Sequence, residues 1–175
     1  MTILSSPTVD GSHYESVGNV SAAELRQSMQ LWVTGVTVIT TAWAGQTAGL
    51  VSNSFTSVSL EPALVSWCID LKSSSVDMWR QTDNFAVHVL NSEQRHLVTR
   101  FARRGGDKFD GVAWSSGRYG SPILEHSAVS AAPLILECEV WDRYDGGDHL
   151  IVVGQVGSLL RPTHFDPLTN HALQS

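Results

Sequence analysis

The sequence predicts a mainly β fold, an antiparallel barrel or sandwich with a few added helices. About six or seven segments alternate apolar and polar residues or are rich in β-branched ones, as strands are. Most of them follow one another across short turns, and only three segments have helical spacing. This succession of hairpins favours an antiparallel sheet over a doubly wound parallel one.

The length and composition indicate one soluble domain. The chain has 175 residues, of which 42% are hydrophobic, which is enough to form a substantial core. Residues 1–20 are polar and lack periodicity, so we expect a flexible tail followed by a single domain over 21–175. No stretch is typical of a membrane span or a secretory signal, so the expected location is the cytoplasm.

Charge is distributed unevenly along the chain. A net charge of -6 argues against binding to nucleic acid or to an anionic membrane surface. Four cations nevertheless cluster in one short segment, namely Arg100, Arg103, Arg104 and Lys108. They could hold a small anion, or they could be a solvated helix end whose charge complements the helix dipole. Arg100 and Arg104 are four residues apart and would share one helix face.

The cysteines and histidines do not form a metal-binding pattern. Cys68 and Cys138 stand apart inside apolar runs, which is typical of buried reduced thiols. The 7 histidines are dispersed and none has a cysteine close by, so we expect no metal site.

The first predicted elements are a helix and a hairpin. Ser21 and Glu24 form a capping-box pattern, and apolar residues then recur at helical spacing until Gly35. Residues 36–43 and 47–55 alternate like strands across a short glycine turn.

The middle of the chain continues with a strand over 63–70 and a short helix over 73–82, for which Ser73 or Ser74 is the expected N-cap. Residues 85–90 then return to strand alternation.

A helix and a long hairpin complete the prediction. Asn91 with Gln94 indicates a capped helix that ends near Gly105. Residues 134–160 read as two long strands about the Asp-Gly-Gly-Asp turn at 145–148.

The stretch GLVSNSFTSVSL, residues 49–60, carries many short hydrogen-bonding side chains. Ser52, Ser54 and Thr56 could simply be a wet strand face. Alternatively, a flat ligand rich in heteroatoms lies on the strand and bonds these hydroxyls, Asn53 and backbone groups. If that ligand carries phosphate, the serines of KSSS at a helix start and the arginine cluster could bind it. The familiar hydrolase, zinc-protease, phosphate-loop and dinucleotide motifs are absent.

Six segments together resemble the flavin reductase family. They are GVTVITT, GLVSNSFTSVSLEPALVSWCID, KSSS, FAVHVL, RFARRGGDKF and GGDHLIVVGQV, in this order and spacing. The resemblance covers about Leu25 to Leu160. It implies an antiparallel split β-barrel with a few peripheral helices, the FMN-binding split barrel.

The resemblance also implies a set of flavin-binding positions. They are Thr47, Ala48, Gly49, Leu50, Val51, Asn53 and Ser54 for the ring and its polar edge, Cys68, Ile69 and Asp70 near the ribityl chain, and Ser74, Ser75, Arg100 and Phe101 at the phosphate end.

His149 is the candidate catalytic residue. It follows a hairpin turn and could be an ordinary strand-start residue, but the matching family position lies near the nicotinamide. The implied activity is hydride transfer from NADH or NADPH to FMN or FAD. Reduced flavin would then pass to a partner monooxygenase component, with the reductase a homodimer. The rival interpretations are a flavin carrier with little nicotinamide-dependent activity and a split-barrel oxidase.

Two departures from the family pattern stand out. Ala63 follows Pro62 where a second proline is common. The C-terminal segment PLTNHALQS carries Asn170 and Ser175 where the family usually has aromatic residues beside the nicotinamide.

Overall fold

The computed structural model describes residues 20–126 and 132–173. Packing divides the chain into two units, Met1–Trp32 and Val33–Ser175. The predicted tail lies almost wholly outside the described residues, so its boundary at residue 20 stays a prediction. Within the described part, no helix is long and apolar enough to cross a membrane.

The first unit contains helix α1, Ala22–Met29. Its capping box is confirmed, because Ser21 Oγ accepts from the Glu24 amide and the Glu24 carboxylate accepts from the Ser21 amide. The predicted end at Gly35 is wrong. Residues just beyond Trp32 bond the C-terminal segment instead: the Val36 amide donates to the Leu168 carbonyl at 2.9 Å, and the Thr34 amide donates to Asn170 Oδ1 at 3.0 Å.

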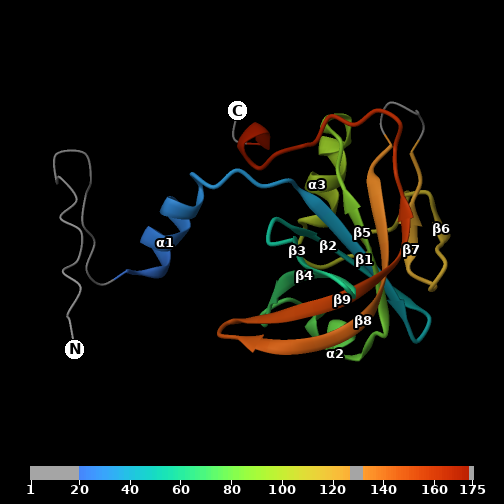
Figure 1. The fold of residues 1–175 in the computed structure, drawn as a ribbon, viewed down its shortest axis with the longest axis horizontal. Helices are drawn as coiled ribbons and strands as arrows, with labels where there is room; N and C mark the ends of the chain where they lie inside the picture. The colour runs from blue at the N-terminus through green and yellow to red at the C-terminus, as the bar shows by residue number, and fades with distance from the viewer. Residues whose placement is uncertain (1–19, 127–131, 174–175) are drawn as a thin grey trace. The chain divides into compact units, whose positions relative to one another are not determined.

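The second unit is mainly β, as predicted. Its large sheet has the strand order β2-β1-β5-β8-β9-β4-β3, with every neighbouring pair antiparallel (Figure 1). A two-stranded sheet of β6 and β7 is separate. The strands are β1 Thr37–Trp43, β2 Gln46–Ser52, β3 Thr56–Leu60, β4 Ala63–Asp70, β5 Asn84–Val89, β6 Trp114–Ser116, β7 Pro122–Leu124, β8 Leu134–Gly146 and β9 His149–Leu160.

The two predicted hairpins are present. Ala44 and Gly45 form the turn between β1 and β2, both with positive φ, as a two-residue hairpin of this kind requires. Gly147, with a φ of 73°, lies in the turn between β8 and β9. The strand predicted over 47–55 is shorter than expected: β2 ends at Ser52 and a separate strand, β3, follows.

Two further strands were not predicted. β6 and β7 have three residues each, too few to show alternation in the sequence.

The predicted helix over 73–82 is shorter than expected. α2 spans Val76–Gln81, and its N-cap is Ser75 rather than Ser73 or Ser74. The Ser75 hydroxyl accepts from the Trp79 indole at 3.2 Å, so the N-cap residue bonds the buried aromatic side chain of its own helix.

The capped start at Asn91 is confirmed with one difference. Asn91 and Gln94 form a capping box on the 3-10 turn η1, Ser92–Gln94, and α3, Arg95–Phe101, follows. A final 3-10 turn, η3, spans His171–Leu173.

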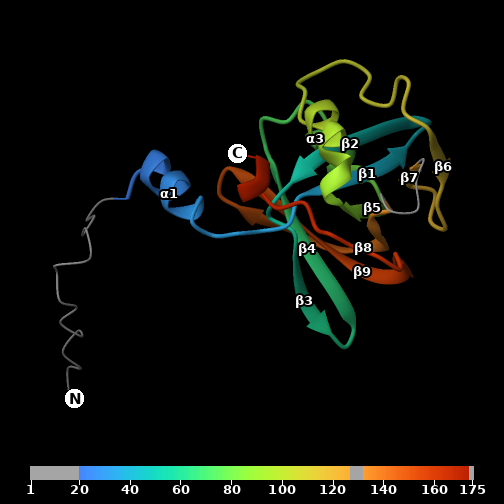
Figure 2. The same ribbon diagram turned by 90° about the horizontal axis from the view of Figure 1, so that it is seen from above.

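β1 contributes to two apolar clusters because its alternate side chains are buried on opposite faces. Ile39 joins the inner cluster around Trp67, Trp79 and Phe85. Val38 joins an outer cluster in which α3 contributes Leu97 and Phe101. Figure 2 shows α3 lying over β1 and β2. Because α3 packs over β1 and β2, the segment that follows α3 is held beside β2.

The two cysteines differ in their surroundings. Cys138 is fully buried, and burial raises the pKa of its thiol to about 12, with the neighbouring Glu137 adding to the effect. Cys68 is only half-buried, so the prediction of a buried thiol holds for Cys138 alone.

His88 is a fully buried histidine that joins three strands. Its Nδ1 lies 3.2 Å from the Val38 carbonyl, and its Nε2 accepts from the Leu124 amide at 3.1 Å. The second bond requires an unprotonated Nε2, and the first then requires a proton on Nδ1. Desolvation lowers the pKa of His88 from 6.5 to about 4, so the folded protein holds the ring neutral.

We expect the free energy of unfolding to fall as the pH decreases from about 6.5 toward 4. In this window the unfolded chain binds a proton at His88 and the folded chain does not, so acid favours unfolding. The full difference is about 3 kcal/mol. Urea unfolding at pH 7 and pH 5 measures the part of this difference that is lost by pH 5, about 2 kcal/mol. His88→Gln should flatten the pH dependence, whereas His164→Gln, at an exposed position, should leave it intact. An unchanged slope in His88→Gln would contradict this account.

Candidate functional site

Three neighbouring cavities follow β2 and the residues just after it. We name each by a feature of its lining. The His149 cavity, about 290 Å³, is lined by Leu50, Val51, Ser52, Asn53, Ser54, Cys68, Ile69, Asp70, Ser73 and His149. Residues from β2, β4 and β9 thus meet in one place.

The cationic cavity, about 600 Å³, adjoins the first. Its charged lining residues are Lys72, Arg103, Arg104 and Lys108, opposed by Asp70 alone. A protein with a net charge of -6 therefore places four of its 11 cations around one cavity. Such a concentration of positive charge favours an anionic ligand.

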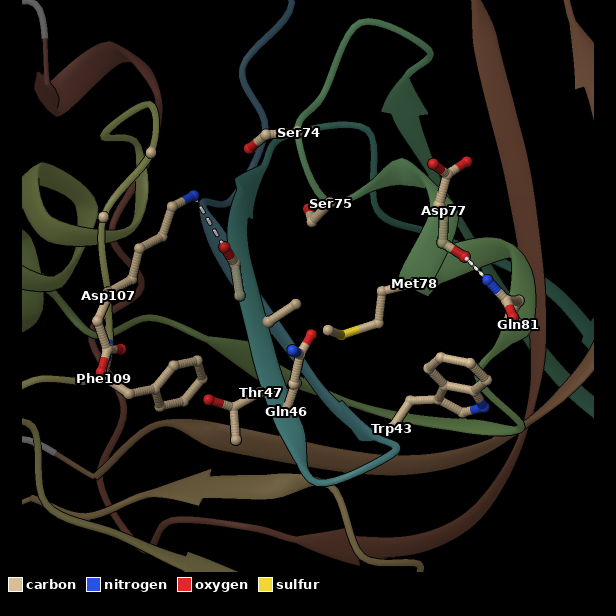
Figure 3. A pocket seen from close by; sticks show the side chains of 15 residues that line it. Trp43, Gln46, Thr47, Ser74, Ser75, Asp77, Met78, Gln81, Asp107 and Phe109 are labelled. Carbon is tan, nitrogen blue, oxygen red and sulfur yellow. Dashed lines mark hydrogen bonds between the residues drawn. The ribbon is translucent and has the colours of Figure 1, made fainter.

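The Trp43 cavity, about 350 Å³, lies at the other end of β2. Figure 3 shows Trp43 and Gln46 at the hairpin end of this cavity, with Met78 of α2 reaching toward β2. Ser74 and Ser75 stand at its opposite end.

The three serines after Lys72 connect the cavities in order. Ser73 lines the His149 and cationic cavities, Ser74 lines the cationic and Trp43 cavities, and Ser75 lines the Trp43 cavity. The loop is shaped by Asp70, whose Oδ1 accepts from the Lys72 amide at 2.7 Å and whose carbonyl accepts from the Ser73 amide at 2.9 Å. The cavities therefore form one elongated site between β2 and this serine loop.

Gly49 lets the segment after α3 reach β2. A Cβ at Gly49 would stand only 2.5 Å from the Phe101 ring, so a larger residue would push that ring away. The Lys108 ammonium donates to the Gly49 carbonyl at 2.9 Å and to the Phe101 carbonyl at 2.8 Å. Partial burial lowers the pKa of Lys108. Lys108 is thus a partly buried cation on the wall of two cavities.

The serines at the end of β2 serve partly as structural links. Ser54 Oγ accepts from the Cys68 amide at 2.9 Å and shares a 2.9 Å hydrogen bond with Ser52 Oγ. Ser52 is buried, so the wet-face interpretation does not hold for it. These bonds tie the end of β2 to β4 and shape the His149 cavity.

His149 is paired with an adjacent carboxylate. Its Nδ1 lies 2.7 Å from Asp148 Oδ1, and the hydrogen bond from His149 lowers the pKa of Asp148. The imidazole remains 42% exposed and lines its cavity. Its orientation is therefore fixed without removing it from solvent.

Most of the predicted flavin positions meet at this site. Thr47, Ala48 and Gly49 line the Trp43 cavity, and Leu50, Val51, Asn53, Ser54, Cys68, Ile69, Asp70 and His149 line the His149 cavity. Ser74, Ser75 and Phe101 line the adjoining parts.

Arg100 is the exception among the predicted positions. Its guanidinium donates to the Asp110 carbonyl at 2.6 Å, and it is not among the residues lining the three cavities. The expectation that Arg100 and Arg104 share a helix face is wrong because α3 ends at Phe101. Arg103 and Arg104 leave the helix and line the cationic cavity instead.

Local charge identified three of the four cations that line the cationic cavity, because Arg103, Arg104 and Lys108 belong to the cluster expected to hold a small anion. Lys72, beside the three serines, was not assigned. Trp43, Gln46 and Met78 have no signal beyond their elements, since only the fold brings the first hairpin beside α2.

The C-terminal segment lies beside the cationic cavity. Asn170 and Leu173 line it, and Leu168 is buried in the outer cluster. The unusual C-terminal segment thus forms part of the wall of the cationic cavity. Among the described residues, no group of histidine, cysteine or acidic side chains could hold a metal ion.

The chain belongs to the flavin reductase like domain family, whose model matches residues 29–173. It is 33% identical over 166 residues to the FMN reductase (NADH) SmoA of Agrobacterium fabrum, covering 95% of this chain and 90% of that protein. It is 37% identical to HsaB of Mycobacterium tuberculosis, a flavin-dependent monooxygenase reductase subunit, covering 77% of this chain and 69% of that one.

A solved structure supports the split-barrel fold. The NADH:FAD oxidoreductase SgcE6 of Streptomyces globisporus, in complex with NAD and FAD fragments, is 33% identical with a TM-score of 0.80, covering 89% of this chain and 92% of that one. Some relatives are longer: the chain spans 41% of a probable flavin reductase of Rhizobium meliloti, at 38% identity over 75% of this chain.

The residues present fit a flavin nucleotide. β2 and the serine loop offer backbone groups and short hydroxyls for a flat polar ring, and the cationic cavity offers charge for phosphate.

We expect Arg103→Ala and Arg104→Ala each to weaken flavin binding about fivefold, because each removes about 1 kcal/mol of charge-assisted attraction near phosphate. Flavin fluorescence quenching measures the dissociation constant, and the effect should shrink as salt is raised. Arg100→Ala should change it less, since its guanidinium is held by Asp110. A larger loss of flavin affinity in Arg100→Ala than in the other two variants would show that Arg100, and not Arg103 or Arg104, binds the phosphate.

Proposed function

We propose that this protein is an NADH:flavin oxidoreductase that supplies reduced FMN or FAD to a partner monooxygenase. The observation that carries the proposal is the arrangement of His149 at one end of a flavin-compatible site, next to a cavity lined by four cations. The family membership and the names of its relatives support it.

The protein's own residues bind and orient the reactants. The bound flavin supplies the redox chemistry by accepting hydride from the nicotinamide. β2 and β4 form one wall of the ring site, and the serine loop with the cations holds the phosphate end. His149 orients the nicotinamide from β9, and its bond to Asp148 favours the tautomer that carries a proton on Nδ1. No proton transfer by His149 is needed.

A loosely held flavin is consistent with this site. The walls are built from backbone groups, short hydroxyls and exposed cations, and Arg103 and Arg104 are both exposed. Contacts of this kind order few side chains and are screened by salt, so they permit exchange of oxidised for reduced flavin. Release to a second protein requires such exchange.

We expect NADH oxidation, followed at 340 nm, to depend on added FMN or FAD, because the flavin is a substrate that must be supplied. Heat-denatured protein provides the control for direct reaction of NADH with flavin. Flavin binding without flavin-dependent NADH loss would contradict the reductase and favour the carrier. Oxygen uptake that requires a third substrate would favour the oxidase.

The proposed enzyme is a homodimer. β3 is the last strand in the sheet order, and its Leu60 and Val58 side chains are 93% and 53% exposed within one chain. An apolar, unpaired sheet edge favours association with another chain. Sedimentation velocity should therefore show a dimer at micromolar concentration, and Leu60→Lys should weaken it. A wild-type monomer at that concentration would rule out this assembly.

A further inference from the structure

The Trp43 cavity has a lining unlike that of the other two. Trp43 offers an indole that is 39% exposed, Met78 offers a thioether, and Gln46 and Gln81 offer amides. An exposed indole beside a thioether provides a surface on which a flat ring can stack. The amides can bond the edge of such a ring.

The Trp43 cavity and the cationic cavity differ in the charge of their lining residues. The cationic cavity has four cations against Asp70, whereas the Trp43 cavity has Asp77 and Asp107 against Lys108 alone. A phosphate would therefore bind in the cationic cavity, and two carboxylates would oppose a second anionic group farther along. The ligand part in the Trp43 cavity should be uncharged and should offer hydrogen-bond donors to carboxylates.

The two cavities are continuous. Ser74, Gly105 and Lys108 line both, so a ligand can pass from one to the other at this point. From Val51, in the His149 cavity, to Gln46, in the Trp43 cavity, β2 extends roughly 17 Å. A mononucleotide flavin ends at its phosphate, and the site continues beyond the cations.

We propose that the Trp43 cavity binds the adenosine part of FAD, and that the protein prefers FAD to FMN. Trp43 stacks on the adenine ring, and the Gln46 amide bonds the edge of that ring, as glutamine does with adenine in nucleic acids. The carboxylate of Asp77 accepts from ribose hydroxyl groups. The inference rests on the proposed flavin site and differs from the family resemblance in one respect. Thr47, Ala48 and Gly49, which the resemblance gives to the flavin ring, line the Trp43 cavity, and the inference gives this cavity to adenosine.

The experiment compares equilibrium binding of FAD and FMN by fluorescence quenching, without nicotinamide. The wild-type protein should bind FAD about tenfold more tightly than FMN, because stacking of one base on an aromatic side chain contributes this much. Trp43→Ala should remove most of that preference by raising the dissociation constant of FAD while leaving that of FMN unchanged. Trp43→Phe should retain part of it, and Gln46→Ala should lower it by a smaller factor.

Trp141→Ala is the matched control, because Trp141 is an exposed indole on β8, 53% accessible, that lines none of the three cavities. It should leave both flavin affinities unchanged. Equal affinities for FAD and FMN in the wild-type protein would overturn the proposal. An equal loss for both flavins in a folded Trp43→Ala protein, checked by circular dichroism, would also overturn it.

Adenosine, which carries no phosphate, tests the cavity directly. Adenosine should displace FAD but leave bound FMN in place. If Trp43→Ala instead raises the KM for NADH with FMN as acceptor and spares FAD binding, the cavity serves the nicotinamide nucleotide and the proposal is wrong. Absence of NADH oxidation with either flavin would defeat the proposed reductase alone, since the binding comparison does not depend on turnover.

Discussion

The contact between Gly49 and the segment after α3 is the constraint on which the site depends. Because Gly49 has no side chain, the Phe101 ring can lie against β2, and the Lys108 ammonium can bond the carbonyls of both residues. These bonds hold the loop that carries Arg103 and Arg104 beside the strand. Without this close approach, Arg103, Arg104 and Lys108 would not be held beside β2, and Lys72 alone would remain of the four cations of the cationic cavity.

The same arrangement explains how an acidic protein can bind an anionic nucleotide. Attraction depends on the local distribution of charge more than on the net value, since salt screens charges beyond about 8–10 Å. Two loops far apart in sequence, one carrying Lys72 and the other Lys108, meet at the cationic cavity. The surplus of negative charge lies elsewhere and is largely screened at that distance.

Local sequence patterns predicted the helix starts, strands and turns more accurately than the contacts between residues far apart in the sequence. Both capping boxes and the turn at Gly147 depend on residues close in sequence, and all three are present. β6 and β7 are too short for periodicity to show, and they are held by contacts such as the bond from Leu124 to His88. Arg100 shows the limit most clearly: helical spacing paired it with Arg104, but the helix ends first, and no local rule could place Asp110 as its partner.

The family resemblance predicted the flavin-binding positions that the structure brings together, but it did not predict the residues at the hairpin end of the site. Such a resemblance reports the backbone contacts that relatives share, which here are the strand and serine loop. Trp43 lies in a hairpin and Met78 in a short helix, and only the fold brings them to one cavity. Because these side chains can be replaced without disturbing the backbone of β2, the ends of the site are where the choice of flavin and the rate of its release can be adjusted. The geometry of the strand therefore sets the reaction, and the residues at either end set the identity of its reactants.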